Sequence, residues 1–189
     1  HNLKNSNILF LANIDPDLQD SVLSQVNKPK LIACDSMNHW ITSKKRSLEK
    51  FLHKVDIFLL NDAEARQFSG EANLLKAAKA IVAKGPKSVI IKKGEHGVIY
   101  YSRKEHFIAP AYPLETVFDP TGAGDTFAGG VIGYLSKAGR INDAVIRKSI
   151  VYGSILASFA VEDFSVNRLL GIKMPDINER YLEFKKLTR

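Results

Sequence analysis

The sequence contains a single cysteine, Cys34, among 189 residues. A disulfide framework and a metal site built from several cysteines are therefore excluded, and the count fits a reducing cytoplasm. Long hydrophobic runs are also missing. The uncharged stretch from Ser149 to Val161 is shorter than the roughly 20 residues that a membrane span requires. No secretory signal stands at the start of the sequence, so we expect a soluble cytoplasmic protein with no membrane partner.

Two nucleotide-binding patterns are absent as well. There is no Gly-x-x-x-x-Gly-Lys-[Ser/Thr] run, which excludes a P-loop kinase. No strand is followed by Gly-x-Gly-x-x-Gly, which disfavours a dinucleotide-binding oxidoreductase. The formal charge of +7 is spread along the chain, and its basic clusters are not interleaved with aromatic residues. We therefore expect a solvated basic surface and no nucleic-acid partner, although a positive field also suits ligands that carry phosphate.

What is present is the composition of an ordinary globular protein, 45% hydrophobic and 25% charged, which predicts one domain spanning residues 1–189. Short apolar runs alternate with amphipathic stretches. Strands are predicted at Ile8–Ala12, Leu31–Cys34, Val55–Leu60, Ser88–Lys92, Val98–Ser102 and, at a sheet edge, Glu105–Ala109. Helices are predicted at Pro16–Val26, Ile41–His53, Ala63–Phe68, Asn73–Lys84, Ala123–Lys137, Ile141–Phe159 and Asp176–Leu187. This alternation predicts an α/β fold with a mostly parallel sheet and helices on both faces.

The most specific segment runs from Asp119 to Gly130 (DPTGAGDTFAGG). It predicts a tight glycine turn that enters a helix near Ala123. The amides of Gly122, Ala123 and Gly124 would then point out of the helix start, where the helix dipole favours an anion. Asp125, in the first turn, is placed to take a proton from a hydroxyl that attacks a phosphate held there. The alternative is a plain capped helix, in which Asp125 only complements the dipole. The full run, with aspartates on both sides of Thr-Gly-Ala-Gly, favours the phosphate site.

This segment resembles the second signature of the PfkB carbohydrate kinases, the ribokinase-like family. Further segments follow strand ends in the order that this family leads one to expect, and the resemblance covers roughly Ile8 to Leu170. Asp35-Ser36-Met37-Asn38 resembles a family strand end that faces the central cleft, and Asn61-Asp62-Ala63-Glu64 is similar to the family's Asn-x-x-Glu motif. The segment from Lys92 to Val98 is similar to the turn beneath the nucleotide. The segment from Gly153 to Ala157 resembles the helix that closes the adenine pocket.

The resemblance implies transfer of the γ-phosphoryl group of ATP to a hydroxyl of a sugar or nucleoside-like acceptor. Asp125 would be the base, and the amides of residues 122–124 would form the anion hole. Asn61 and Glu64 would order water around Mg²⁺. Asp119 and Thr121 lie where some family members bind a monovalent cation such as K⁺. The residues implied in nucleotide binding are Lys92, Gly94, Gly97, Gly153, Ser154 and Ala157.

Taken singly, the supporting motifs have simpler interpretations. Asn61 and Glu64 fit an ordinary helix cap with a first-turn acid, Gly94 and Gly97 fit a hairpin turn, and Asp35 fits a loop cap. The family also carries a first signature, most sugar contacts and a lid ahead of the segment seen here, and none of these is present in this sequence. We therefore expect the carboxy-terminal portion of such a kinase, truncated at its amino terminus. Because the lid often forms a dimer in that family, the full-length form is a candidate homodimer. A non-catalytic nucleotide-binding or regulatory module, or an inactive kinase fragment, is the alternative function.

Overall fold

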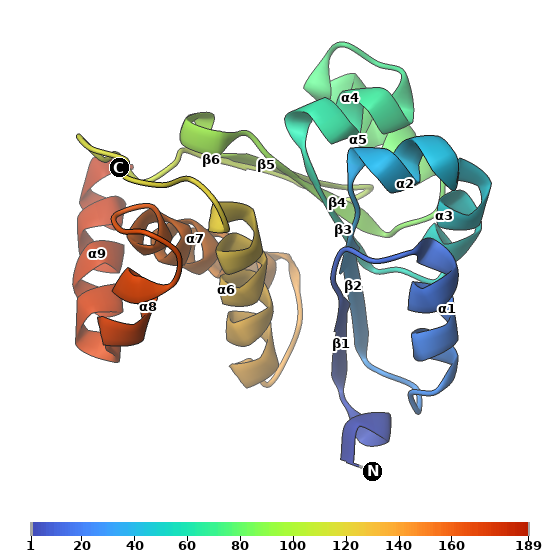
Figure 1. The fold of residues 1–189 in the computed structure, drawn as a ribbon, viewed down its shortest axis with the longest axis horizontal. Helices are drawn as coiled ribbons and strands as arrows, with labels where there is room; N and C mark the ends of the chain where they lie inside the picture. The colour runs from blue at the N-terminus through green and yellow to red at the C-terminus, as the bar shows by residue number, and fades with distance from the viewer. Residues whose placement is uncertain (1, 189) are drawn as a thin grey trace. The chain divides into compact units, whose positions relative to one another are not determined.

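The computed structural model describes residues 2–188, which form a six-stranded sheet and a set of helices (Figure 1). The strands lie in chain order across the sheet, and neighbours from β1 to β4 run parallel. The strands are β1 (Ile8–Leu11), β2 (Leu31–Asp35), β3 (Ile57–Asn61), β4 (Ser88–Lys92), β5 (Val98–Ser102) and β6 (His106–Ala109). The predicted α/β class with a mostly parallel sheet is thus confirmed.

Helices separate most of the strands and fill the carboxy-terminal part of the chain. The helices are α1 (Pro16–Ser24), α2 (Asn38–Ser43), α3 (Lys45–Leu52), α4 (Asp62–Ser69), α5 (Leu74–Ala83), α6 (Ala123–Lys137), α7 (Asp143–Ala160), α8 (Asn167–Gly171) and α9 (Met174–Leu187), with short 3-10 turns η1 (Asn2–Asn5) and η2 (Gly94–His96). Across residues 2–188, none of these helices combines the length and the apolar character needed to cross a bilayer.

The chain divides into two compact units. The first, here called the sheet unit, comprises the residues up to Lys93 together with Ile99–Phe107. The second, here called the helical unit, comprises Gly94–Val98 and the residues from Ile108 onward. The prediction of one domain over residues 1–189 stays a prediction.

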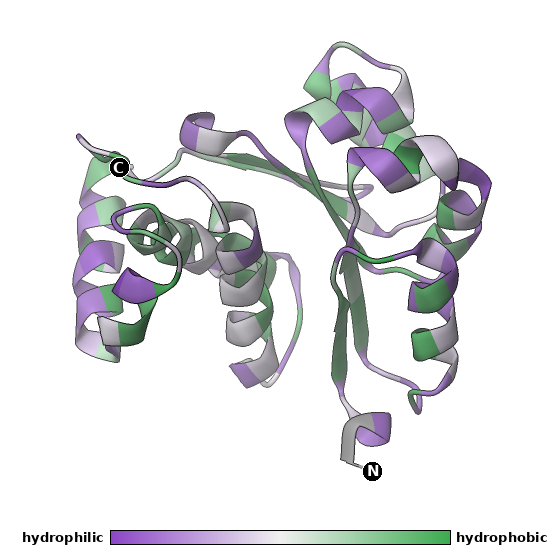
Figure 2. Ribbon diagram, viewed as in Figure 1, coloured by the Kyte–Doolittle hydropathy of each residue, from purple (hydrophilic) through white to green (hydrophobic). Residues whose placement is uncertain are grey.

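The core of the sheet unit is built from the strands and the helices that follow them. Ile57, Phe58, Leu59 and Leu60 of β3 are at most 1% exposed, because a strand inside a parallel sheet has both of its faces covered. Hydrophobic residues run along the strands (Figure 2). Helix residues complete the same core cluster, namely Ile41, Leu48, Phe51, Leu52, Ala65, Phe68, Ala78, Ile81 and Val82.

The helices of the sheet unit form one contiguous layer: α3 contacts α1 and α2, and α4 contacts α2 and α5. Polar residues at their starts explain where they begin. Asp15 directly precedes Pro16, the first residue of α1, and its carboxylate accepts a hydrogen bond from the Asp17 amide. The Asn73 side chain in the same way accepts hydrogen bonds from the first-turn amides of α5. Helices were predicted on both faces of the sheet. This layer covers one face, and a helix layer on the second face stays a prediction.

The prediction of one helix over Ile41–His53 is wrong. The structure has two, α2 and α3, which meet at Lys44, a residue with φ −129° and ψ 30°. The Lys44 ammonium reaches Asp15 at 3.0 Å and Asp17 at 2.5 Å. We attribute the break to this tertiary contact, because no glycine or proline lies in the segment. Helix α8 was not predicted, and the other predicted elements differ from the structure by at most two residues at each end.

In the helical unit, α6 and α7 pack through glycines. A Cβ placed on Gly153 would lie 2.8 Å from the Phe127 carbonyl oxygen, and one on Gly130 would lie 2.9 Å from the Gly153 Cα. The two helices therefore approach more closely than larger residues would permit. Helix α9 packs against α7 through Phe184, which lies in a buried cluster with Ile155 and Phe159 of that helix.

Candidate functional site

The glycine turn ahead of α6 has the predicted form. Gly122 is the residue before the helix and has φ +79°, a left-handed conformation that glycine adopts without strain. Within residues 2–188, no side chain caps this helix start. The Thr126 amide bonds to the Gly122 carbonyl at 2.9 Å, which closes the first turn.

One of the three amides expected to be free is engaged. The Ala123 amide donates to the Pro120 carbonyl at 3.2 Å, which corrects that part of the prediction. The cause is the tight turn itself, which brings the carbonyl of residue 120 over the helix start. The amides of Gly122 and Gly124 donate to no backbone carbonyl in the described chain. These two amides are therefore the ones available to an anion.

Asp125 is exposed and is the acidic residue in the first turn of α6. Its position next to the Gly124 amide, which donates to no backbone carbonyl, puts a carboxylate beside the helix start where an anion was predicted to bind. Buried neighbours follow it directly: Phe127 and Ala128 are at most 5% exposed and anchor the helix in the helical unit. The turn that carries Asp125 is thus held by packing on its inner side, while the carboxylate faces outward.

Asp119 ties the start of this segment together. Its Oδ1 accepts the Thr121 amide at 2.9 Å. Hydrogen bonds from the backbone and side chain of Thr121, and from the Ser165 backbone, hold the pKa of Asp119 below its usual range. Asp119 therefore carries its negative charge at neutral pH, which favours binding of a cation. The structure places Asp119 and Thr121, both predicted as cation ligands, in one turn.

The residue that anchors this turn was missed by the sequence interpretation. The Val161 carbonyl, at the end of α7, accepts the amides of Phe118 at 2.8 Å and Asp119 at 3.3 Å. A backbone carbonyl of this kind has no sequence signature, because any residue can supply it. The amide of Ser165 donates to the Asp119 carboxylate, and Ser165 has the left-handed φ of +57°. No glycine at this position signals that conformation in the sequence.

In the sheet unit, Asn61 and Glu64 form a reciprocal cap at the start of α4. The Asn61 side-chain oxygen accepts the Glu64 amide at 2.8 Å, and Glu64 Oε2 accepts the Asn61 amide at 2.8 Å. The simpler interpretation of these residues, a helix cap with a first-turn acid, is therefore a feature of the structure. Glu64 is half-buried, and desolvation raises the pKa of its carboxyl, an effect opposed by the bond from the Asn61 backbone and by the charge of Lys92.

Lys92 belongs to the same group of residues. It ends β4 and lies in register with Asn61, which ends β3. Because ligands of open α/β sheets bind at the carboxyl ends of the strands, this pairing collects Asn61, Glu64 and Lys92 at such an edge. Lys92 and Glu64 are both partly exposed there.

Gly94 begins the short 3-10 turn η2 and Gly97 follows it, and together they connect β4 to its neighbour in the sheet, β5. This placement does not contradict the simpler interpretation, a turn between the two strands. Gly94 and Gly97 have φ values of +57° and +82°. A Cβ on Gly97 would lie 2.1 Å from the Ala109 carbonyl oxygen, so no other residue fits there. A Cβ on Gly94 would meet no atom within 4 Å, so only the positive φ at this position favours glycine.

The residues predicted to close an adenine pocket lie on α7. Gly153 and Ser154 are buried, and Ala157 is half-buried. Gly153 is used for close packing against Phe127, as described above, so its small size has a structural explanation within the helical unit. Ala157 is the most accessible of the three.

The strand end at Asp35 contains a polar group that sequence interpretation did not identify. Gln19 is fully buried, and its amide nitrogen donates to the carbonyls of Leu11, Ala12 and Asp35 at 3.0–3.1 Å. It thereby ties the carboxyl ends of β1 and β2 together. Ser36 is 7% exposed, and its hydroxyl has no hydrogen-bond partner in the described chain. Asp35 is buried as well, with 5% of its surface exposed.

Comparison with known proteins identifies the family. The model of the pfkB family carbohydrate kinases matches residues 3–170. The chain belongs to this family. Among curated relatives, the cytidine kinase of Thermococcus kodakarensis is 30% identical over 143 residues, which are 73% of this chain and 51% of the relative.

Solved structures agree on the pfkB fold. The nucleoside kinase of Methanocaldococcus jannaschii superposes with a TM-score of 0.76 at 21% identity, covering 94% of this chain and 56% of that protein. A protein assigned as ribokinase II from E. coli, solved with ATP and Mg²⁺, gives a TM-score of 0.67 at 26% identity, covering 81% and 49%. The chain thus spans about half the length of these relatives.

Proposed function

We propose that this protein transfers the γ-phosphoryl group of ATP to a hydroxyl of a sugar or nucleoside. Membership of the pfkB family supports the reaction class. The observation that carries the proposal is the start of α6, where the amides of Gly122 and Gly124 are unpaired and the carboxylate of Asp125 follows in the same turn. An anion site and a base side by side are what transfer to a hydroxyl requires.

In the proposed reaction Asp125 takes the proton of the acceptor hydroxyl. The acceptor oxygen forms a bond to the γ-phosphorus, the bond from that phosphorus to the β,γ-bridging oxygen breaks, and ADP leaves with the electron pair. The transition state spreads negative charge over the phosphoryl oxygens. The amides of Gly122 and Gly124, together with the positive end of the α6 dipole, stabilise that charge.

The residues Asn61 and Glu64 fit Mg²⁺ held through water. Both supply oxygen, the ligand that Mg²⁺ prefers, but the Asn61 oxygen and Glu64 Oε2 each accept a backbone amide. Glu64 is half-buried, and its raised pKa means that the ionised form gains from a nearby cation. When bound, the metal neutralises charge on the nucleotide phosphates. We propose that Glu64 orders its water shell and that Asn61 holds Glu64 in place.

The remaining assignments follow the family pattern. We propose Lys92, Gly94 and Gly97 as contacts to the nucleotide phosphates and ribose, and Gly153, Ser154 and Ala157 as the wall beside the adenine. Asp119, ionised at neutral pH, and Thr121 are proposed to hold a monovalent cation such as K⁺. The matched relatives named above are nucleoside kinases and a ribokinase, which favours a ribose-containing acceptor or ribose itself. A homodimer is proposed for the whole protein only.

Two measurements on this chain test the proposal. Binding of ATP in the presence of Mg²⁺ is measured by calorimetry, and formation of ADP is followed with a panel of nucleosides, ribose and fructose. Binding together with ADP formation for one acceptor class supports the kinase. Binding without transfer to any acceptor points to the alternative, a nucleotide-binding module. If MgATP does not bind, the kinase proposal is overturned.

A further inference from the structure

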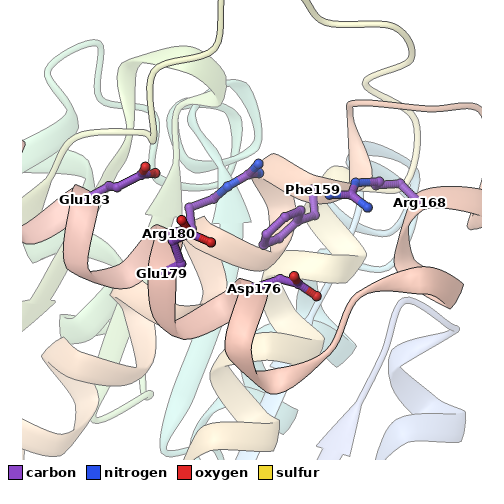
Figure 3. A pocket seen from close by; sticks show the side chains of 6 residues that line it. All are labelled: Phe159, Arg168, Asp176, Glu179, Arg180 and Glu183. Atoms are coloured by element: carbon purple, nitrogen blue, oxygen red, sulfur yellow. The ribbon is translucent and has the colours of Figure 1, made fainter.

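A cluster of charged residues in the helical unit surrounds Arg180 of α9 (Figure 3). The Arg180 side chain is 14% exposed. Its guanidinium lies 3.5 Å from the centre of the Phe159 ring and 4.9 Å from that of Tyr112. Its two terminal nitrogens donate to Ser158 Oγ at 3.0 Å and to Glu162 Oε1 at 2.6 Å. Arg180 is therefore fixed by two aromatic rings and two oxygens.

A second arginine acts on the same carboxylate. The Nε of Arg168, from α8, donates to Glu162 Oε2 at 3.0 Å. Both oxygens of Glu162 are thus bonded to arginines from two different helices. A cavity of about 200 Å³ lies beside this cluster. Its lining residues are Phe159, Arg168, Asp176, Glu179, Arg180 and Glu183.

Glu162 is adjacent to the residue that anchors the glycine turn. Val161 ends α7, and its carbonyl accepts the amides of both Phe118 and Asp119. The Glu162 amide itself returns to the Phe159 carbonyl at 3.2 Å, so the backbone of residues 161 and 162 is held as one turn. Moving Glu162 moves Val161, and with it the two amides that begin the segment ahead of α6.

The chain of contacts continues to the unpaired amides. Asp119, held at its amide by Val161, accepts the Thr121 amide on its carboxylate. Thr121 directly precedes Gly122. Helix α9 is therefore connected to the start of α6 by a continuous series of hydrogen bonds and peptide bonds, all of them inside the helical unit. Because the arginine–glutamate pair is mostly shielded from water, removing one partner leaves the other charge poorly compensated.

We infer that Arg180 is a positioning residue for the phosphate-binding turn: through Glu162 and Val161 it fixes residues 118–122 and so the direction of the Gly122 and Gly124 amides. The consequence for catalysis rests on the function proposed above. The positioning itself does not, because it concerns the geometry of the turn alone. A residue that merely docked α9 would stabilise the helix without controlling the turn.

The first test is amide hydrogen exchange of this chain without any nucleotide. Arg180→Met keeps the length and the packing on Phe159 but removes both hydrogen bonds. We expect the amides of Phe118 and Asp119 to exchange about tenfold faster or more. The matched control is Lys186→Met, which changes an exposed cation on the same helix and is expected to leave those amides unchanged. Glu162→Gln, which weakens both arginine bonds without altering α9, is expected to follow Arg180→Met and serves if the latter folds poorly.

The second test separates positioning from stability during turnover. For Arg180→Met we expect kcat to fall about tenfold, while KM for MgATP changes less than twofold. Arg180→Lys retains one cationic donor and is expected to recover part of the loss. Faster exchange at Phe118 and Asp119 with the kcat effect supports the inference. Unchanged exchange at these amides, with only a lower melting temperature, overturns it. Faster exchange in a chain whose unsubstituted form transfers no phosphate leaves the positioning supported and removes the proposed function instead.

Discussion

Helix α4 starts with two side chains bonded to its first amides, whereas helix α6 starts at a glycine with no side-chain cap in the described chain. In α4, Asn61 and Glu64 satisfy backbone groups that water or a ligand would otherwise satisfy. In α6 the corresponding groups of Gly122 and Gly124 stay unpaired. An anion needs unpaired amides and no competing carboxylate on them, so the two starts are suited to different tasks.

The comparison also shows how one pair of residues serves two roles. The Asn-x-x-Glu segment stabilises its helix, and the same cap fixes the Glu64 carboxylate beside Lys92 at the strand ends. The cap therefore does not argue against a role at the metal. It supplies the rigid support that such a role needs. Separating the two roles requires substitutions that keep one and remove the other.

The largest effect is expected at α6, from Asp125→Asn. Removing the proposed base is expected to lower kcat by about 10²- to 10⁴-fold, because Asn cannot accept the hydroxyl proton. MgATP affinity, measured by calorimetry, should change little. Asp143→Asn, a first-turn acid of α7 outside the proposed site, is the control for a helix-dipole effect. Equal losses of MgATP affinity and of turnover in Asp125→Asn would contradict the base role.

A second prediction makes α6 resemble α4 by adding a carboxylate to its start. Gly122→Asp places a negative charge where phosphate is proposed to bind, and MgATP affinity is expected to fall about tenfold or more through repulsion. Gly122→Asn is the matched control, because it has the same shape without the charge. Both residues tolerate the positive φ better than other side chains do, and a Cβ meets nothing within 4 Å. If calorimetry finds equal affinities for the two variants, no anion binds at this turn.

A third prediction removes the cap of α4. Asn61→Ala is expected to lower the free energy of unfolding by about 1 kcal/mol, measured by urea denaturation. Glu64→Gln keeps an oxygen for the Asn61 amide and is expected to cost less than half of that. It nevertheless removes the charge, so the Mg²⁺ concentration needed for half-maximal activity should rise. A Glu64→Gln chain with the original Mg²⁺ requirement would restrict the residue to its structural role.

The contrast between the two helix starts also explains what sequence interpretation could achieve. Strands β4 and β5 and helix α6 were predicted with the bounds that they have, because Gly, Pro and apolar runs mark their ends locally. The glycine turn was predicted for the same reason. The engaged Ala123 amide was not, because it depends on where the Pro120 carbonyl lies in the folded turn.

The roles of residues that depend on contacts far apart in the chain could not be predicted from the sequence. Lys44 ends a helix by bonding to aspartates at the start of α1. In α1 itself Gln19 is buried, while Leu18 and Val22 are 57% and 39% exposed, which is the reverse of what hydrophobicity suggests. The hydrogen bonds from Gln19 to the carbonyls at the ends of β1 and β2 determine which face of α1 is buried. Val161 and Arg180 belong to the same class, since their effect on the glycine turn exists only in three dimensions.

The smallest expected effect is a pH dependence that has opposite signs in the two regions. The lowered pKa of Asp119 means that its ionised form stabilises the fold above the unfolded-state pKa, and this contribution is lost as pH falls through the folded pKa. The raised pKa of Glu64 means the reverse: its contribution is present below the unfolded-state pKa and is lost as pH rises through the folded pKa. In urea titrations from acid to neutral pH, Asp119→Asn should therefore fall progressively below the unsubstituted chain in stability. Glu64→Gln should instead gain on it over the same range. Parallel pH profiles for the two variants would show that the two carboxylates do not differ in environment as the two helix starts imply.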